Sequence, residues 1–548
     1  MSKSKYIFVS GGVISGLGKG ITTATTALLL KLYGFKVSVM KADMYLNLDA
    51  GTMNPLEHGE IFVTVDGAET DQDLGHYERF LGQDMNKENY FTMGQAYKNV
   101  LNKERSLAYG GKCVEGNIHI PEEIIQRIQE VQRKNKAEIT VIEVGGTVGE
   151  YQNILFFEAI RRFKQKNPKN VALIHVVYLP VPSFLGEMKS KPAQASIYEL
   201  YRLGLQPDFV ICRSQQEIDH KRRHTIALNT GVKEENIIAA PDVDTIYRIP
   251  LLFENQGLAK KILKTLQLKP RKKTLNQWEN FVAKIDKAKK EIKIAIVGKY
   301  FASGNFALED SYVCVIEAIK HASWSLGIKP KIQWFDSERL ENKKDAPRME
   351  KELQTYQGII VPQGWGSRGT EGKIKTIKLA REKKIPYLGL CFGMQMAVIE
   401  FARNVVGLKN ANSTEVNQKT PYPIIHIMPE QEKYLNKRQY GGTIRLGQWP
   451  CKIRENTILS RAYGKETILE RHRHRYEVNN DYRELLEKNG MIISGVSPDN
   501  QLVEAIELSQ KHHPFFVGTQ FHPEYQSRPL SPHPLFVAFI KAAAKTRL

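Results

Sequence analysis

Short runs of apolar residues alternate with helix-like segments along the first half of the chain. The apolar runs span residues 6–9, 36–40, 139–144, 171–179 and 209–212. Between them, segments 22–32 and 121–133 show helical periodicity, and Pro121 is expected in the first turn, where its missing N–H leaves no hydrogen bond unmade. Continuous apolar runs separated by helices predict a parallel sheet with helices on both faces.

The same alternation begins again in the second half of the chain. Further strands are predicted at residues 292–297, 331–335, 358–361, 387–390 and 515–520. Segments 311–321 and 394–402 predict helices. The predicted fold class is therefore α/β, with two doubly wound domains on mainly parallel sheets, at residues 1–268 and 292–548.

Residues 269–291 differ from both domains and predict a linker. Trp278, Phe281, Val282 and Ile285 recur at helical spacing and predict one amphipathic helix. Basic residues outnumber acidic ones in this region. A nucleic-acid-binding arm is one interpretation of that excess, but the solvated face of a helix is favoured.

Composition excludes several classes of protein. Charged residues make up 25% and hydrophobic residues 42% of the 548 positions, as in folded globular chains. No apolar stretch approaches the roughly 18 residues of a membrane span, so no membrane association is expected. The five cysteines form no CxxC motif, which argues against a disulfide framework or a zinc finger and favours a reducing cytoplasm.

The net charge of +20 has three interpretations. It fits a nucleic-acid-binding protein, a basic proteome, or a protein that handles polyanionic small molecules. No DNA or RNA recognition motif is present, so the last two are favoured and no nucleic-acid partner is expected.

A glycine-rich segment at residues 10–22 joins the first predicted strand to the first helix. Glycines let backbone N–H groups approach phosphates, and a helix N-terminus favours anions. Lys19 adds a mobile positive charge. The segment departs from the standard P-loop, because Val13 and Gly20 stand where Gly and Ser or Thr are required. A nucleotide-binding loop is favoured over a turn that serves only packing.

Carboxylates for a magnesium ion occur at two places. The cluster at residues 69–73 offers several, although for Asp71 alone a surface carboxylate is the better interpretation. Glu143 lies near the C-terminal end of a predicted buried strand, where open α/β sheets bind ligands. A buried carboxylate is unfavourable unless it is paired or metal-bound, so a functional role is favoured for Glu143.

Cys391 stands between an apolar strand and a helix and is flanked by small residues. Such a turn lowers a thiol pKa and supplies N–H groups for an oxyanion, as in nucleophile elbows. Far downstream, His522 and Glu524 are two residues apart in a segment expected to be extended, so Glu524 can orient His522. This combination favours a catalytic Cys391 over a cysteine that only packs.

These and other motifs resemble the CTP synthase family over nearly the whole chain. The supporting segments are residues 11–21, 66–71, 73–80, 143–149, 410–415, 441–447 and 470–479. The resemblance implies an N-terminal synthetase and a C-terminal class I glutamine amidotransferase. It implies that ATP phosphorylates O4 of UTP and that ammonia from L-glutamine then displaces phosphate to give CTP.

The resemblance also implies site residues, cofactors and partners. The positions matching the ATP site are Gly16, Leu17, Gly18, Lys19, Gly20, Ile21, Asp73, Pro241, Asp242 and Val243. Those matching the UTP or CTP site are Ser15, Glu150, Tyr151, Gln152, Lys189, Ser190, Lys191, Pro192, Ala193, Gln194 and Thr225. Those matching the glutamine site are Gly364, Phe392, Gly393, Met394, Gln395, Glu415 and Arg475.

The catalytic residues implied are Cys391, His522, Glu524, Lys19 and Lys41. Asp73 and Glu143 match the Mg²⁺ ligands. GTP is implied as an allosteric activator, with Arg445 in the segment linked to it, and the family pattern implies a homotetramer built as a dimer of dimers. In that tetramer, segment 189–194 serves the neighbouring subunit's UTP site.

Several positions depart from the family pattern. Prolines are replaced by Met44 and Ala50, a glycine by Gln363, phenylalanines by Trp365 and Asn229, a UTP-binding lysine by Thr225, and Asp-Ile-Glu by residues 150–152. Divergence within the family is favoured. An amidoligase for another pyrimidine nucleotide or related acceptor is the alternative. A non-catalytic ligand sensor or filament protein is a third hypothesis, and the retained catalytic residues argue against it.

Overall fold

The computed structural model describes residues 4–12, 14–271, 273–299, 302–303, 306–307, 309–437 and 441–546. The chain separates into two compact units. The first runs to Leu48 and then from His76 to Val282, and the second comprises Asp49–Gly75 and the chain from Ala283 onward. Residues 49–75, called the inserted segment below, thus belong with the second unit although they lie early in the sequence.

The first unit contains a parallel sheet. Its strands are β1 (Lys5–Gly11), β2 (Val37–Asp43), β5 (Tyr90–Thr92), β6 (Ile139–Val144), β7 (Val171–Tyr178), β8 (Phe209–Ser214) and β9 (Ile237–Pro241). Their order is β5-β2-β6-β1-β7-β8-β9, and every neighbouring pair is parallel. The strands are buried almost throughout, as their continuous apolar sequences predict.

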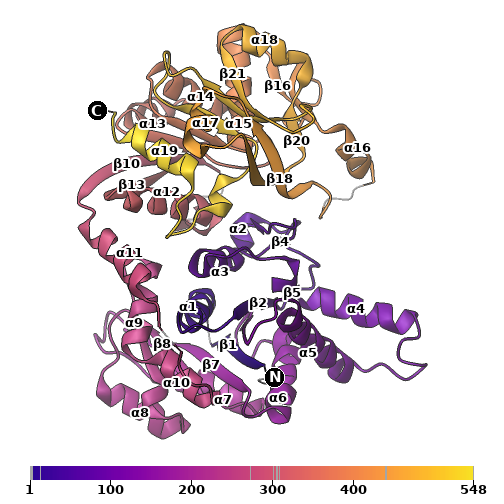
Figure 1. Ribbon diagram of the computed structural model, residues 1–548, viewed down its shortest axis with the longest axis vertical. Helices are drawn as coiled ribbons and strands as arrows, with labels where there is room; N and C mark the ends of the chain where they lie inside the picture. Colours follow the sequence, from indigo (N-terminus) through magenta and orange to yellow (C-terminus); the bar gives the residue numbers. More distant parts are fainter. Residues whose placement is uncertain are drawn as a thin grey trace. The chain divides into compact units, whose positions relative to one another are not determined.

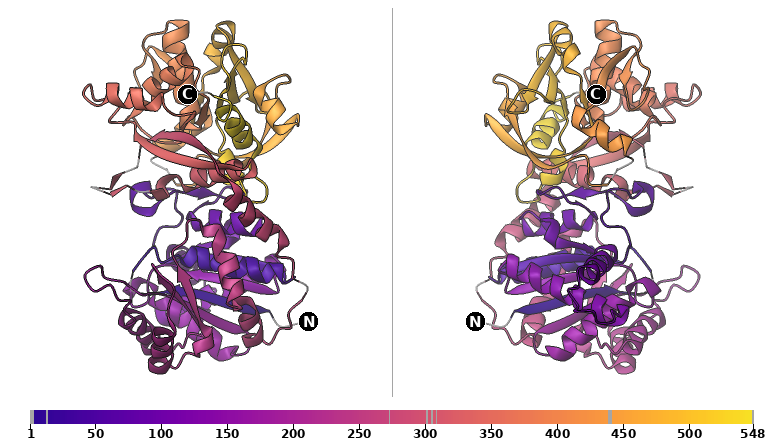
Figure 2. Two further views of the ribbon diagram at one scale, coloured as in Figure 1. Left: turned by 90° about the vertical axis from the view of Figure 1, so that its left-hand side faces the viewer. Right: turned by 90° about the vertical axis from the view of Figure 1, so that its right-hand side faces the viewer.

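Helices cover both faces of this sheet (Figures 1 and 2). They are α1 (Lys19–Leu32), α3 (Asp73–Leu81), α4 (Met93–Arg105), α5 (Gly116–Lys134), α6 (Ile154–Lys166), α7 (Lys191–Arg202), α8 (His220–Thr230), α9 (Ile249–Asn255), α10 (Leu258–Thr265) and α11 (Asn276–Lys287). Apolar side chains of α4, α5 and α6 form one core with the sheet. Helices α1, α9 and α10 contact one another, and α1 lies against β1, β2 and β6.

Helix α5 corrects the expectation for Pro121. The helix begins at Gly116, so Pro121 lies inside it and not in its first turn. A proline there cannot donate to the carbonyl four residues earlier, that of Asn117. The Arg162 guanidinium donates to that carbonyl oxygen at 2.9 Å. This tertiary contact supplies the hydrogen bond that the helix lacks, which the local sequence pattern could not predict.

Helix α11 forms within the predicted linker. Trp278, Phe281 and Val282 are buried, and the Trp278 indole donates to the Tyr247 carbonyl at 2.9 Å. The same face packs against the rings of Tyr247 and Phe80. The periodic apolar residues therefore cover part of the first unit, and the charged residues of the helix face solvent.

The second unit contains a mixed sheet. Its strands are β10 (Lys290–Gly298), β13 (Ile328–Asp336), β14 (Gly358–Val361), β15 (Tyr387–Leu390), β18 (Arg445–Ile453), β19 (Thr467–His474), β21 (Met491–Val496), β22 (Val503–Leu508) and β23 (Phe516–Thr519). Their order is β13-β10-β14-β15-β23-β22-β21-β18-β19. Pairing is parallel from β13 to β23 and antiparallel from β23 to β19.

Two apolar cores fill the opposite faces of this sheet. The helices are α12 (Val313–Ser325), α13 (Ala346–Leu353), α14 (Thr370–Glu382), α15 (Phe392–Phe401), α16 (Pro429–Asn436), α17 (Ile458–Tyr463), α18 (Arg483–Lys488) and α19 (Pro534–Ala543). Smaller strands are β11 (Ala302–Ser303), β12 (Phe306–Ala307), β16 (Ala411–Ser413), β17 (Tyr422–Ile427) and β20 (Tyr476–Val478). The inserted segment adds α2 (Pro55–His58), β3 (Phe62–Val63) and β4 (Glu69–Thr70).

Both units are thus α/β folds with helices on both faces of a sheet. Among the residues that the structure describes, no helix is long and apolar enough to cross a membrane.

Candidate functional site

The glycine-rich loop of the first unit leads from β1 into the N-terminus of α1. Gly18 adopts the left-handed region with φ 84° and precedes the first turn, which carries no acidic side chain. Lys19 begins the helix, and its ammonium donates to the Gly146 carbonyl at 2.6 Å. Residues 14–21 of this loop lie within the described chain, whereas Val13 lies outside it. The open first turn and its lysine can bind a phosphate group.

Adjacent strands β2 and β6 bring a lysine and a carboxylate together. Lys41 pairs with Glu143 in the strand register, and its ammonium lies 2.8 Å from the Glu143 carboxylate. The Tyr77 hydroxyl donates to the other oxygen of Glu143, and Asp43 lies 3.7 Å from the Lys41 ammonium. All three charged residues are at least 95% buried. Asp43 was missed in the sequence analysis. This residue is the last of β2, and Glu143 is the last but one of β6, so the same signal marks both.

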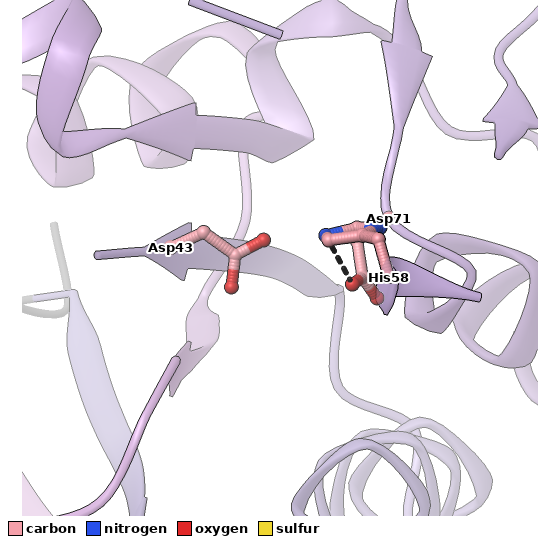
Figure 3. Close-up of side chains that lie close together, drawn as sticks. All are labelled: Asp43, His58 and Asp71. Carbon is pink, nitrogen blue, oxygen red and sulfur yellow. Dashed lines mark ion pairs between the residues drawn. The ribbon is translucent and has the colours of Figure 1, made fainter. Parts of the chain in front are cut away.

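The acidic cluster at residues 69–73 divides by environment. His58 and Asp71 of the inserted segment form an ion pair at 3.4 Å, drawn in Figure 3 together with Asp43, which ends β2. Asp73 begins α3, and its backbone N–H donates to Asp71 at 2.8 Å. Glu69 is buried and bonded to the Arg473 guanidinium at 2.9 Å. In the division of the chain into two units, Asp73 belongs to the second unit and Glu143 to the first. Glu69 forms an ion pair within the second unit.

The predicted UTP residues lie at several loops of the first unit. Segment 189–194 leads into the first turn of α7, where Gln194 donates to the hydroxyl of Ser190, the residue before the helix, at 3.1 Å. Glu150 accepts from the backbone N–H and hydroxyl of Thr147 at 2.9 and 2.6 Å and so stabilises its own turn. Tyr151 is 89% exposed. Ser15 and Gln152 are exposed as well.

Helix α8 carries Thr225, and its hydroxyl donates to the Lys221 carbonyl at 2.8 Å within the helix. Arg222, an arginine of the same helix, donates to the Met188 carbonyl and to Glu187, both at 2.8 Å, and also binds Asp219. These contacts make Arg222 a support for the loop that precedes α7.

The predicted adenine-side residues 241–243 begin at Pro241, the last residue of β9. The Arg213 guanidinium donates to the Pro241 carbonyl at 3.2 Å and to Asp242 at 2.8 Å. Arg213 therefore fixes this segment at the C-terminal edge of the sheet, the edge from which the phosphate loop also emerges.

Cys391 occupies a strained turn between β15 and α15. Its backbone has φ 52° and ψ −101°, an unfavourable conformation for a residue with a side chain. The turn requires glycine at 389 and 393, because an added Cβ would lie 2.9 Å from the Gly393 carbonyl carbon and 1.9 Å from the Val361 carbonyl oxygen, respectively. The Cys391 backbone N–H donates to the Thr519 carbonyl at 2.7 Å and ties the turn to β23.

His522 and Glu524 lie beside this cysteine in the second unit. The His522 Nδ1 atom is 2.7 Å from the Glu524 carboxylate, and both side chains are buried. Burial alone would lower the pKa of His522, but the Glu524 carboxylate and the Cys391 sulfur raise it to about 10. The raised pKa favours an imidazolium that Glu524 holds beside Cys391, an arrangement suited to proton transfer during attack by a cysteine nucleophile.

A pocket opens over Cys391. It is lined by Gln363, Gly364, Trp365, Cys391, Phe392, Gln395, Glu415, Arg473, His474, Arg475, Tyr476 and His522. Burial raises the pKa of Glu415, which accepts from the Gly366 backbone N–H at 2.7 Å. Arg475 donates to the Thr443 hydroxyl at 2.9 Å. An anionic and a cationic side chain in one small pocket suit an amino acid with free ammonium and carboxylate groups.

Two of the predicted glutamine residues have mainly structural side-chain contacts. Gln395 donates to the Tyr476 carbonyl at 2.9 Å and to Gln520 at 3.2 Å. Met394 is fully buried in the core and packs against Gly518. Met394 and Gly393 are absent from the pocket lining, so only their backbones can serve the site.

Comparisons with known proteins agree over the full chain. Residues 5–268 match the family described as CTP synthase N-terminus, and residues 307–542 match glutamine amidotransferase class-I. The CTP synthase of Sulfurisphaera tokodaii is 48% identical over 542 residues, which cover 99% of both chains. The chain belongs to the CTP synthase family.

Other CTP synthases are similarly related. That of Caldanaerobacter subterraneus is 47% identical over 100% of this chain and 99% of its own. That of Pyrococcus furiosus is 47% identical over 98% of each chain.

Two departures from the CTP synthase pattern have structural partners in the second unit. The Trp365 ring lies under the Arg473 guanidinium at 5.4 Å, and tryptophan is the best aromatic partner for a cation. Gln363 donates to the Glu60 carboxylate of the inserted segment at 2.9 Å. Both replacements therefore belong to contacts made by the loop between β14 and α14.

Two buried lysines support the same loop, and sequence reasoning missed both. The Lys299 ammonium donates to the carbonyls of Trp365 and Gly366 at 2.5 and 2.8 Å, and burial lowers its pKa to about 8. Lys373 donates to the Pro362 carbonyl at 2.9 Å. Burial, with Lys299 nearby, lowers the pKa of Lys373 well below its usual value. Both cations lie against the Phe392 ring, at 4.6 and 5.1 Å.

Arg445, in the segment linked to GTP, is also buried. It donates to Glu504 at 2.7 Å, and Glu504 binds His472 at 2.7 Å. The Arg445 side chain therefore holds β18 to β22 within the second unit, and its charge is neutralised there.

Proposed function

We propose that this CTP synthase family member is a glutamine-hydrolysing C–N ligase that converts UTP to CTP with ATP. The observation that carries the proposal is the Cys391–His522–Glu524 arrangement beneath a pocket with Glu415 and Arg475, in a chain related to CTP synthases over its whole length. An acceptor other than UTP finds no support in these relatives. A reducing cytoplasm remains the expected location.

In the glutaminase step, Cys391 attacks the carboxamide carbon of glutamine. His522 holds the proton taken from the thiol and transfers it to the departing nitrogen, while Glu524 keeps the imidazole oriented. Glu415 and Arg475 are proposed to bind the α-ammonium and α-carboxylate of the substrate. Lys299 and Lys373 fix the loop 362–366 that faces the thiol. The products are ammonia and, after hydrolysis of the thioester, glutamate.

In the synthetase step, the loop at Gly16–Ile21 with Lys19 is proposed to bind ATP, and segment 189–194 to bind UTP phosphates. Carbonyl oxygen is a poor leaving group, and its phosphorylation makes displacement by ammonia favourable. Lys19 and Lys41 are cations suited to stabilise charge on the phosphoryl group in transfer.

Glu143 is the proposed magnesium ligand of the first unit, and Asp73, the other position that matches the family's magnesium ligands, belongs to the second unit. The buried carboxylates of Glu143 and Asp43, at the ends of adjacent strands, are the hard oxygen donors that Mg²⁺ prefers. When bound, the ion would neutralise phosphate charge. Lys41 meanwhile holds the Glu143 carboxylate in place at 2.8 Å.

GTP activation and a homotetramer, a dimer of dimers, are proposed from family membership. Because Arg445 is engaged with Glu504, we expect it to shape a GTP site without contacting the ligand. GTP should accelerate synthesis from glutamine and not synthesis from ammonia. Exposed Leu101 and Leu107 are apolar surface suited to a subunit contact, and mass photometry at several concentrations tests the tetramer.

The deciding experiment uses Cys391→Ala. We expect the variant to lose CTP formation from glutamine and to retain the wild-type rate with ammonium chloride, ATP and UTP. The reason is that Cys391 serves only ammonia release. Equal loss with both nitrogen sources would contradict two separate sites, and absence of CTP from the wild-type enzyme would contradict UTP as acceptor.

A further inference from the structure

Gln363 adds a side chain to the glutaminase pocket at a position where the family pattern has glycine. It follows β14 in the loop that faces Cys391, and it lines the same pocket. Its backbone carbonyl accepts from the Tyr312 hydroxyl at 3.1 Å and lies 3.5 Å from the Lys373 ammonium. The main chain of Gln363 is therefore held from two sides.

The orientation of the Gln363 amide is fixed by Glu60. The amide nitrogen Nε2 lies 2.9 Å from one carboxylate oxygen of Glu60, and the other oxygen accepts from the Cys314 backbone N–H at 2.7 Å. Glu60 is 3% exposed. An ionised carboxylate only accepts hydrogen bonds, so the NH2 group of Gln363 must face Glu60 and the oxygen Oε1 must point the other way.

The Oε1 atom of Gln363 is buried and accepts no hydrogen bond from any residue that the structure describes. A buried acceptor without a donor is unfavourable, so a ligand that brings an N–H group is expected to bind there. Glu415 and Arg475 are already assigned to the α-ammonium and α-carboxylate of glutamine. The carboxamide N–H groups, next to the carbon that Cys391 attacks, are the remaining donors of that substrate.

We propose that Gln363 is a substrate-contacting residue whose Oε1 accepts a hydrogen bond from the carboxamide nitrogen of bound glutamine. The contact holds the carboxamide in place for Cys391 and favours amide substrates over esters. This role rests on the proposed glutaminase function of the pocket.

The test compares two substrates that differ only at this donor. L-Glutamate γ-methyl ester keeps the α-groups of glutamine and the carbonyl that Cys391 attacks, but it carries no amide N–H. Gln363→Met preserves side-chain length and removes the acceptor. We expect kcat/KM for glutamine hydrolysis to fall about tenfold, the order of one neutral hydrogen bond. Hydrolysis of the ester should change less than about twofold by the same reasoning.

Gln363→Gly, which restores the family residue, should show the same loss of preference for amide over ester. Because the measured quantity is a ratio of two substrates on one preparation, partial misfolding lowers both rates and leaves the ratio unchanged. Gln354→Met, an exposed glutamine in the same unit, is the matched control and should behave as wild type. CTP synthesis from ammonia should be unaffected in all three variants.

Equal losses on both substrates would overturn the proposal, because Gln363 would then act through the α-groups or through the fold. An unchanged preference in Gln363→Met and Gln363→Gly would also overturn it, since Oε1 would then bind only water. Failure of the proposed function is recognised separately, by glutamine hydrolysis that persists in Cys391→Ala.

Discussion

The Glu69–Arg473 ion pair gives the sharpest test of how the inserted segment supports the glutaminase site. The Arg473 Nε atom lies 2.9 Å from one Glu69 oxygen, and the Gly442 backbone N–H lies 3.3 Å from the other. The side chains are 11% and 2% exposed. The Arg473 carbonyl in turn accepts from the Cys391 thiol at 3.6 Å.

Glu69→Gln keeps the shape of the side chain and removes its charge. The guanidinium of Arg473 then remains buried without a counterion, and the new NH2 group must face either Arg473 or the Gly442 N–H. Removing one partner of a buried pair costs about 3–5 kcal/mol, and the retained acceptor oxygen places this variant at the lower end, about 3 kcal/mol. For a unit of this size, with about 2.1 cal/mol/K of unfolding entropy per residue, that corresponds to a melting temperature lower by about 5 °C.

Differential scanning calorimetry measures this loss, and Glu466→Gln is the matched control because Glu466 is exposed in the same unit. The control should melt within about 2 °C of wild type, as surface substitutions usually do. Glutaminase kcat/KM should fall in Glu69→Gln, because Arg473 positions the carbonyl beside Cys391. If the two variants melt together and hydrolyse glutamine at the same rate, the pair does not support the site and the reasoning is refuted.

Three further predictions concern the catalytic groups and the UTP site. Lys19→Ala should abolish amination with either nitrogen source, because about 3 kcal/mol of transition-state stabilisation is lost. Glutamine hydrolysis should persist at a basal rate. Normal synthesis from ammonia would contradict this prediction. Glu524→Gln should lower the pKa of His522 from about 10, because the carboxylate that raises it is gone. A raised pKa keeps the imidazolium present at neutral pH and loses it as the pH rises through about 10, so the variant should lose the imidazolium at a lower pH. NMR titration of the His522 imidazole measures this, and an unchanged midpoint would show that Glu524 does not raise the pKa of His522. Thr225→Lys should lower the KM for UTP by up to about a hundredfold, the value of one charge-assisted contact of about 1.5–3 kcal/mol. The reason is that the Thr225 hydroxyl bonds within its own helix and carries no charge, while Arg222 is bonded to Glu187. An unchanged KM would show that another cation fills the position.

Local sequence signals predicted the chemistry-bearing turns of this protein. The glycines around Cys391 and the apolar run before it predicted a strand–turn–helix, and the structure has that turn with Cys391 at φ 52°. The buried strand that ends near Glu143 was also predicted from its sequence. A parallel strand that is covered on both faces is a continuous apolar run, and such a run is visible in the sequence. Such patterns show whether each residue faces a core. They are local, because they depend only on residues that are close together in the sequence.

Tertiary structure alone decided which polar and charged groups meet. Glu69 is paired with Arg473, which is 404 residues away, and Glu60 with Gln363, which is 303 residues away. Lysines are rarely buried, so nothing in the sequence distinguished Lys299 and Lys373 from the many exposed lysines of this chain. Their burial is tolerated because backbone carbonyls of one loop accept from both ammonium groups. Pairing of this kind depends on which strands become neighbours in a sheet. The periodicity of apolar residues along the chain does not predict which strands these are.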